Sequence, residues 1–154
     1  MVFELHLKTE TVEQACSKLV LCCQRDSIVS EIVEQMRLEK KGSALICDGE
    51  RLAGIFTERD VLKLLAKRSS MDVTVESVMT ANPQVVGVSD SIEKAISLMS
   101  QGGYRRLPVV DAQHRPVGML KVSGILHYLV QHFPNYVYNL PPVPGQTPIH
   151  REGA

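Results

Sequence analysis

Apolar positions recur along the chain in two matching sets. From Val29, and again from Ile92, they follow the helical spacing i, i+3, i+4, i+7. A short apolar segment typical of a strand comes before each set, over residues 19–23 and 83–88. The spacing therefore predicts two amphipathic helices, each preceded by a strand. Their apolar faces are Val29, Ile32, Val33 and Met36 in one copy and Ile92, Ala95, Ile96 and Met99 in the other.

The segments after the two amphipathic helices also match each other. Residues 43–56 and 106–120 are typical of β-hairpins, and further helices are expected over 60–68 and 125–132. An offset of 63 residues superposes the first halves of the two copies, and one extra residue in the second hairpin turn makes the offset 64 afterwards. The chain therefore contains two copies of one structural unit.

One unit of this size is too small to bury its own sheet. We therefore predict an α/β (α+β) fold in which two repeats, each helix–strand–helix–strand–strand–helix, pack sheet to sheet with pseudo-twofold symmetry. The expected organisation is a lead-in over 1–10, the first repeat over 11–68, a linker over 69–73, the second repeat over 74–132 and a proline-rich tail over 133–154.

Composition narrows the class of protein. Seventeen basic residues balance seventeen acidic ones, which argues against a nucleic-acid or anionic-membrane partner found by bulk charge. No apolar run approaches the roughly 20 residues of a membrane span, and the first residues lack the features of a secretory signal. We therefore expect a cytoplasmic protein.

Two minor features leave alternatives open. The four cysteines form no C-x-x-C motif, so they are interpreted as buried thiols, with a redox or metal role as the alternative. In the tail, Pro141 to Pro144 form a P-x-x-P that either docks in an SH3-like groove or is incidental.

The segment Gly54–Asp60 carries the main polar motif of the first copy. It reads GIFTERD and joins a predicted strand to a predicted helix. Thr57 and Asp60 then occupy the N-cap and N3 positions of a capping box, which by itself satisfies backbone N–H groups. A helix N-terminus also attracts phosphate, and a carboxylate there accepts hydrogen bonds from a vicinal diol. The segment alone leaves both a cap and a ligand site open.

The second copy provides an internal comparison. It reads GMLKVSG over residues 118–124, with Lys121 in place of the threonine and Gly124 in place of the aspartate. The same helix is predicted there without either residue, so the fold does not require this cap. The comparison favours a ligand role for Thr57 and Asp60.

Arg105 and Arg106 form the second polar concentration, at the start of an otherwise apolar strand. Neighbouring strand residues point to opposite faces, so we expect at most one of them to face a given pocket. A planar guanidinium suits phosphate. A solvated strand edge, or an ion pair with Glu58 or Glu93, is the alternative.

The doubled unit, GIFTERD, the strand RRLPVVD and the VMT before the second repeat's first strand together resemble a known family. Residues 11–132 are similar to a tandem pair of cystathionine-β-synthase (CBS) domains, also called a Bateman module. The family motif G-h-x-[ST]-x-x-D fits at Gly54, Ile55, Thr57 and Asp60. The resemblance implies that Asp60 holds the ribose hydroxyls of an adenine nucleotide and that Thr57 contacts ribose or phosphate.

The resemblance also implies the remainder of the pocket. Basic residues come from the RRLPVVD strand, and apolar residues from the end of the motif strand and from the other repeat's first strand enclose the adenine. The implied nucleotide-binding set is Gly54, Ile55, Phe56, Thr57, Asp60, Pro83, Gln84, Val85, Arg105 and Arg106.

The chain departs from the family pattern at three positions. Lys121 and Gly124 replace the polar residues of the second pocket, so we expect it to bind nucleotide weakly or not at all. Lys121 either points to solvent or reaches a phosphate in the first pocket. Gly42 stands where a base is frequent, so phosphate recognition is expected to depend on the arginines. AMP, ADP, ATP and S-adenosylmethionine all remain possible ligands.

The function that these observations predict is regulatory. We expect an adenine-nucleotide sensor with one competent pocket that transmits its ligand state to a separate, unidentified partner protein. The alternative is a non-catalytic dimerisation or interaction module with a decayed pocket. The resemblance implies a homodimer formed through the helices. No nucleophile–base set or metal cluster can be assembled from the sequence, so no catalytic residue, metal site or catalytic cofactor is expected.

Overall fold

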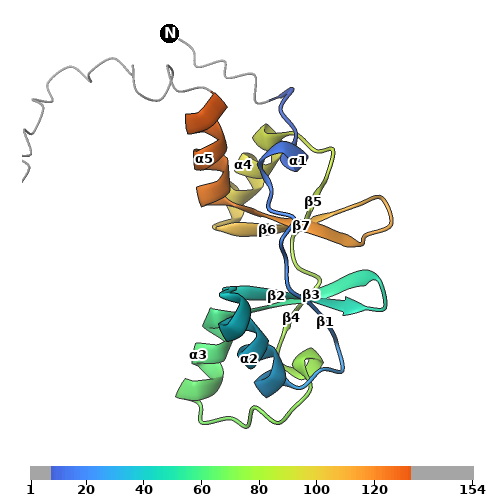
Figure 1. The fold of residues 1–154 in the computed structure, drawn as a ribbon, viewed down its shortest axis with the longest axis vertical. Helices are drawn as coiled ribbons and strands as arrows, with labels where there is room; N and C mark the ends of the chain where they lie inside the picture. The colour runs from blue at the N-terminus through green and yellow to red at the C-terminus, as the bar shows by residue number, and fades with distance from the viewer. Residues whose placement is uncertain (1–7, 133–154) are drawn as a thin grey trace, which may run out of the picture.

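Two mixed β-sheets face each other, and helices cover their outer faces (Figure 1). The computed structural model describes residues 8–132, so the P-x-x-P of the tail lies outside the described residues. The first repeat contains α1 (Val12–Ala15), β1 (Cys22–Gln24), α2 (Val29–Glu39), β2 (Ser43–Asp48), β3 (Arg51–Thr57) and α3 (Glu58–Ala66). The second contains the 3-10 helix η1 (Val75–Ser77), β4 (Thr80–Ala81), β5 (Val86–Gly87), α4 (Ile92–Gly102), β6 (Arg106–Val110), β7 (Pro116–Lys121) and α5 (Val122–His132).

The two sheets share an arrangement of three strands, to which the first sheet adds a fourth. In the first, β1 runs parallel to β2, β2 and β3 form an antiparallel hairpin, and β4 pairs with the free edge of β3. In the second, β5 runs parallel to β6, and β6 and β7 form the hairpin. The predicted α/β fold of two repeats packed sheet to sheet is confirmed.

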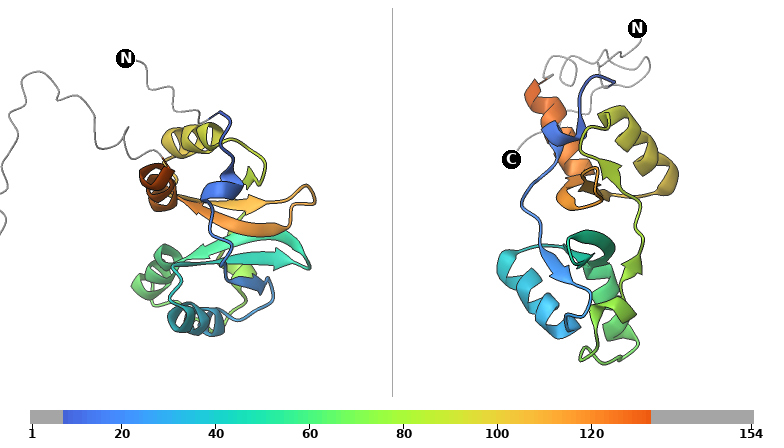
Figure 2. Two further views of the ribbon diagram at one scale, coloured as in Figure 1. Left: turned by 45° about the horizontal axis from the view of Figure 1, so that its top comes forward. Right: turned by 90° about the vertical axis from the view of Figure 1, so that its right-hand side faces the viewer.

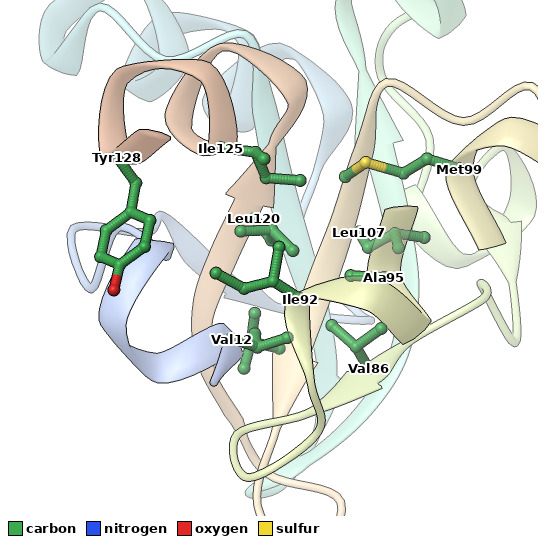
Figure 3. Close-up of a cluster of buried hydrophobic side chains, with 10 residues drawn as sticks. Val12, Val86, Ile92, Ala95, Met99, Leu107, Leu120, Ile125 and Tyr128 are labelled. Atoms are coloured by element: carbon green, nitrogen blue, oxygen red, sulfur yellow. The ribbon is translucent and has the colours of Figure 1, made fainter. Parts of the chain in front are cut away.

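Apolar side chains fill three layers of this fold. One layer lies under the helices of each repeat, and Figure 3 shows the layer of the second repeat, in which Ile92, Ala95 and Met99 of α4 face the sheet. These three belong to the face predicted by the helical period. The layer between the sheets contains the buried residues Leu45, Leu52, Val110 and Met119.

The first helical turn of each repeat packs on the other repeat. Val12 of α1 belongs to the core under α4 and α5, and Val75 of η1 belongs to the core under α2 and α3. Both side chains are fully buried. The chain accordingly crosses between the layers twice, once on each side of the molecule (Figure 2, right). The repeats therefore interlock, which the sequence did not predict. The backbone pairs that bridge the repeats include Ser17 with Met119 and Thr80 with Ile55.

Part of the predicted linker completes the start of α2. The N-cap residue of this helix is Ile28, whose side chain cannot cap. The N–H groups of Val29 and Ser30 instead donate to the carbonyl oxygens of Val73 and Met71, each at 3.0 Å. The segment between the repeats thus supplies acceptors that a helix N-terminus otherwise lacks.

No helix among residues 8–132 combines the length and the apolar character needed to cross a membrane. The longest described helices have 11 residues. At 1.5 Å per residue they measure about 16 Å, roughly half of a bilayer's hydrocarbon core.

Candidate functional site

A cavity of about 580 Å³ lies between the repeats, where β3 ends and α3 begins. Gly42, Ile55 and the first two turns of α3 form its wall on the first repeat. Pro83, Gln84 and the segment 103–106 form its wall on the second. These distant parts of the sequence meet because β4 pairs with β3 and leads the chain along the cavity.

Thr57 and Asp60 lie together at the start of α3. They form a capping box, in which the backbone N–H of Thr57 donates to Oδ2 of Asp60 at 2.9 Å and the Thr57 hydroxyl donates to the same oxygen at 3.1 Å. No described residue donates a hydrogen bond to the second carboxylate oxygen, Oδ1. The cap therefore uses one oxygen of Asp60 and leaves the other for a ligand.

Arg106 brings a buried cationic group to the same cavity. Its Nη1 atom is buried and has no hydrogen-bond partner among the described residues. Leaving such a donor unsatisfied costs about 1–3 kcal/mol, and more for a charged group. A Cβ built on Gly42 would lie 3.1 Å from this Nη1, so the glycine leaves room for the guanidinium.

Three exposed cations, Arg59, Lys63 and Arg105, line the mouth of the cavity. None of them pairs with a carboxylate of residues 8–132 within 4.0 Å, whereas three arginines elsewhere do. The expected alternative of an ion pair between the Arg105–Arg106 motif and Glu58 or Glu93 is likewise not formed among the described residues. With Arg106, the lining carries four cations and only two carboxylates.

Arg105 and Arg106 both line the cavity, so the expectation that at most one would face a given pocket is wrong. Side chains alternate between faces only within a strand, and β6 begins at Arg106. Arg105 lies in the turn before the strand, where its carbonyl oxygen accepts the N–H of Val122 at 3.0 Å. The turn frees its side chain from the alternation.

The structure places three of the ten implied site residues away from the cavity: Gly54, Phe56 and Val85. Phe56 is fully buried beneath α2 and α3, because alternation along β3 turns it to the opposite face of the sheet. Gly54 lies under β4, and Val85 packs between the sheets. The seven that line the cavity are Ile55, Thr57, Asp60, Pro83, Gln84, Arg105 and Arg106.

Several lining residues were not predicted. Thr80 and Asn82 reach the cavity through β4, whose pairing with β3 has no signal in the sequence. Tyr104 lies at the mouth beside the arginines. Arg59 and Lys63 are four residues apart on α3 and therefore share a helix face, so this pair could have been found from the predicted helix.

The equivalent cleft of the second motif is nearly closed. Its volume is about 40 Å³, and its lining includes Lys41, Leu19 and Lys121. The ammonium of Lys41 donates a hydrogen bond to the carbonyl oxygen of Leu19 at 2.8 Å, which joins two sides of the cleft. Lys121 lines this cleft and not the large cavity.

The position equivalent to Asp60 also lacks space. A Cβ built on Gly124 would lie 3.2 Å from the carbonyl oxygen of Ala15 in α1. This contact is tighter than ordinary van der Waals packing, and the neighbouring atom is backbone. The second copy therefore lacks the carboxylate, and a side chain at Gly124 would require the backbone at Ala15 to shift slightly.

The cysteines and metal-type residues form no second site among residues 8–132. All four cysteines are free thiols. Burial raises the pKa of Cys23 and of Cys47 to about 11, so both remain neutral and pack as small apolar groups. Within the described ranges no group of three or more His, Cys, Asp or Glu side chains could hold a metal ion.

Comparison with known proteins gives matches over both repeats. Residues 10–67 and 75–131 match the CBS domain family. The CBS domain-containing protein CBSCBSPB3 of Arabidopsis thaliana is 32% identical over 113 residues, which cover 72% of this chain and 20% of that protein. The chain thus spans about a fifth of this curated relative.

Solved structures share the fold. CBSX2 in complex with AMP is 26% identical, with a TM-score of 0.71 over 79% of this chain and 97% of that one. The CBS domain pair of MJ0100, in complex with 5′-methylthioadenosine and S-adenosylmethionine, is 24% identical, with a TM-score of 0.69 over 76% and 97%. The two matched segments together cover more than half of the sequence and fall one on each repeat. The chain belongs to the CBS domain family and contains a tandem CBS pair.

Proposed function

We propose that this CBS pair is a regulatory module that binds an adenine nucleotide in the cavity between the repeats and transmits its occupancy to another protein. CBS pairs of the same fold are bound to AMP in CBSX2 and to adenosine derivatives in MJ0100. The lining contains neither histidine nor cysteine. Because these relatives hold adenine ligands, we assign the cavity to ligand binding.

One observation carries the proposal. Asp60 contributes a carboxylate oxygen with no described donor, and Arg106 contributes a buried guanidinium nitrogen with no described acceptor. Both residues line one cavity, from opposite repeats. A carboxylate oxygen accepts from a ribose diol, and a guanidinium donates to phosphate. A nucleotide carries both groups in one molecule.

The lining also offers a place for the base. Ile55 and Pro83 are half-buried, both line the cavity and both present apolar surface. Flat apolar surfaces suit a heteroaromatic ring, which loses water on both faces when it is enclosed. Thr57 retains the acceptor capacity of its hydroxyl beside the proposed ribose position.

The position of the cavity suggests how occupancy is transmitted. Its walls come from both repeats, so a ligand that contacts both favours one relative arrangement of the sheets over another. A coupling of about 1–3 kcal/mol is typical of such regulation.

We also propose that the module forms a homodimer through its helices. Leu62 and Leu65 on α3 are 65% and 57% exposed, and Leu126 on α5 is 58% exposed. Such side chains on two helices favour association over solvent exposure. Sedimentation equilibrium of the native chain and of Leu62→Glu measures the association directly, and a native chain that stays monomeric at all concentrations would contradict the proposal.

Thermal unfolding with adenosine, AMP, ADP and ATP tests the nucleotide proposal. A ligand at 100 times its Kd adds about 2.7 kcal/mol to the free energy of unfolding. We expect stabilisation of the native chain, loss of that stabilisation in Asp60→Ala, and a native response in the control Asp72→Ala, whose exposed carboxylate lies outside the cavity. No stabilisation of the native chain by any of the four ligands supports the alternative of a decayed pocket. An unchanged response of Asp60→Ala places the site elsewhere.

A further inference from the structure

We propose that the cavity selects nucleotides with two or more phosphate groups, and that Arg59 and Lys63 of α3 bind the terminal phosphates. This inference rests on the proposed function and names the ligand class of the same site. The cationic residues of the lining divide into one inner group and a set at the mouth, and each part has a different role.

The inner part is a single guanidinium. Arg106 is half-buried, and its Nη1 is fully enclosed next to Gly42. One enclosed cation matches one phosphate group, the one attached to the ribose that Asp60 binds. This part of the site serves AMP, ADP and ATP alike and does not distinguish between them.

The outer part is a set of cations with no described partner. Arg59 and Lys63 lie on one face of α3, and Arg105 lines the same cavity from the second repeat. All three are exposed, and none pairs with a described carboxylate within 4.0 Å. A monophosphate held by Arg106 leaves these side chains to water, whereas a longer phosphate chain extends towards them.

The charge balance supports the same ligand class. Four cationic and two acidic side chains line the cavity, which leaves two positive charges in surplus. S-adenosylmethionine carries a sulfonium, an ammonium and a carboxylate, so it is net positive and the surplus disfavours it. ATP carries more negative charge than AMP, so the surplus attracts it more strongly, and this difference is largest at low salt because Arg59, Lys63 and Arg105 are exposed.

Glu58 acts in the opposite direction. Its carboxyl carbon would lie 3.5 Å from a Cβ built on Gly42, the same point that Arg106 approaches to 3.1 Å. A carboxylate in this position repels a phosphate chain as it leaves the inner guanidinium. Removing its charge is therefore expected to strengthen ATP binding more than AMP binding, the reverse of removing Arg59 or Lys63.

The test is titration calorimetry with AMP, ADP, ATP and S-adenosylmethionine at low salt and without divalent cations. One charge-assisted contact changes affinity about tenfold, so we expect ATP to bind the native chain at least about tenfold more tightly than AMP. In the double variant Arg59→Gln/Lys63→Gln, ATP affinity falls to that of AMP while AMP affinity stays within about twofold of native. Glu58→Gln widens the difference between ATP and AMP.

The control variant is Lys67→Gln/Arg68→Gln. It removes the same charge from the end of the same helical segment, outside the cavity lining, and should preserve the ATP preference. Equal affinity of the native chain for AMP and ATP overturns the inference, as does an equal loss for both ligands in Arg59→Gln/Lys63→Gln. Failure of the native chain to bind any adenine ligand instead overturns the proposed function. Thermal melts of every variant without ligand verify that the fold is retained.

Discussion

Thr57 and Asp60 are joined by two hydrogen bonds to one oxygen, Oδ2, at 2.9 and 3.1 Å. The two interpretations of GIFTERD, a helix cap and a ligand site, are therefore compatible. The cap orients the carboxylate and occupies one of its oxygens. The second repeat starts α5 without these residues. Both repeats share one backbone hydrogen bond at this point, from the N–H of Val122 to the carbonyl oxygen of Arg105 at 3.0 Å and from that of Glu58 to that of Gly42 at 3.1 Å.

Substitutions of Asp60 separate the cap from the proposed site. Asp60 is the N3 residue of the capping box, and Asn keeps an oxygen that accepts the Thr57 N–H, so Asp60→Asn should lose only the charge–dipole contribution, about 0.3–1 kcal/mol, to the free energy of unfolding in urea. Asp60→Ala loses the acceptor as well and should be the less stable of the two. Both should weaken nucleotide binding about tenfold or more, because the charged acceptor is lost. Native affinity in Asp60→Asn would assign the residue to the cap alone.

Gly42 should affect nucleotide affinity through the position of the Arg106 side chain. A Cβ on Gly42 would lie 3.1 Å from Nη1 of Arg106, so Gly42→Ala should displace the guanidinium and reduce nucleotide affinity. A double-mutant cycle with Arg106→Gln measures the coupling, and the two losses should not add. Additive losses would mean that Gly42 acts independently of the arginine.

Gly54 and Gly118 should be required for the interlocked fold. A Cβ on Gly54 would overlap Met79 and lie 2.9 Å from the carbonyl oxygen of Thr80, and one on Gly118 would lie 2.8 Å from that of Ser17. Each Ala variant should therefore lose about 1–3 kcal/mol, as overpacked cores do, measured by urea unfolding. If both variants were nearly as stable as the native chain, the segments at Thr80 and Ser17 would not pack closely against Gly54 and Gly118.

The second cleft should remain empty. Calorimetry should give one nucleotide per chain, and Lys41→Ala should keep this stoichiometry because Gly124 supplies no carboxylate even when the Lys41–Leu19 hydrogen bond is removed. Lys40→Ala is the neighbouring control. A second bound nucleotide in Lys41→Ala would show that Lys41 alone closes the cleft.

Stability should decline in alkali. Burial raises the pKa of Cys23 and of Cys47 from 9.0 to about 11, so the folded chain retains these protons more tightly than the unfolded chain does. The free energy of unfolding should therefore be unaffected by these groups below pH 9 and fall as the pH rises from 9 towards 11. Urea unfolding across this range should show a shallower decline in Cys23→Ala/Cys47→Ala. An equally steep decline would assign the effect to other groups, such as Tyr128, whose pKa burial raises to about 12.

Much of the site could be predicted from local sequence. The site residues that were wrongly predicted share one cause, which is the geometry of the strands. Thr57 and Asp60 are three residues apart on one helix start, so local geometry alone brings them together. Phe56 was misplaced because strand alternation, not proximity in sequence, decides which residues face a cavity. Arg105 was misjudged because the sequence did not show that the strand begins one residue later.

The sequence by itself determined the repeat, the order of helices and strands apart from β4, and the asymmetry between the two motifs, because these depend on short-range periodicity and residue identity. Only the tertiary structure decided that α1 packs on the second repeat and η1 on the first. It also decided that β4 brings Thr80 and Asn82 to the cavity and that Lys41 spans the second cleft. These are contacts between residues far apart in the sequence. They arise because the sheet of each repeat buries its remaining apolar face against the sheet of the other. No local sequence pattern specifies which residues meet when this happens.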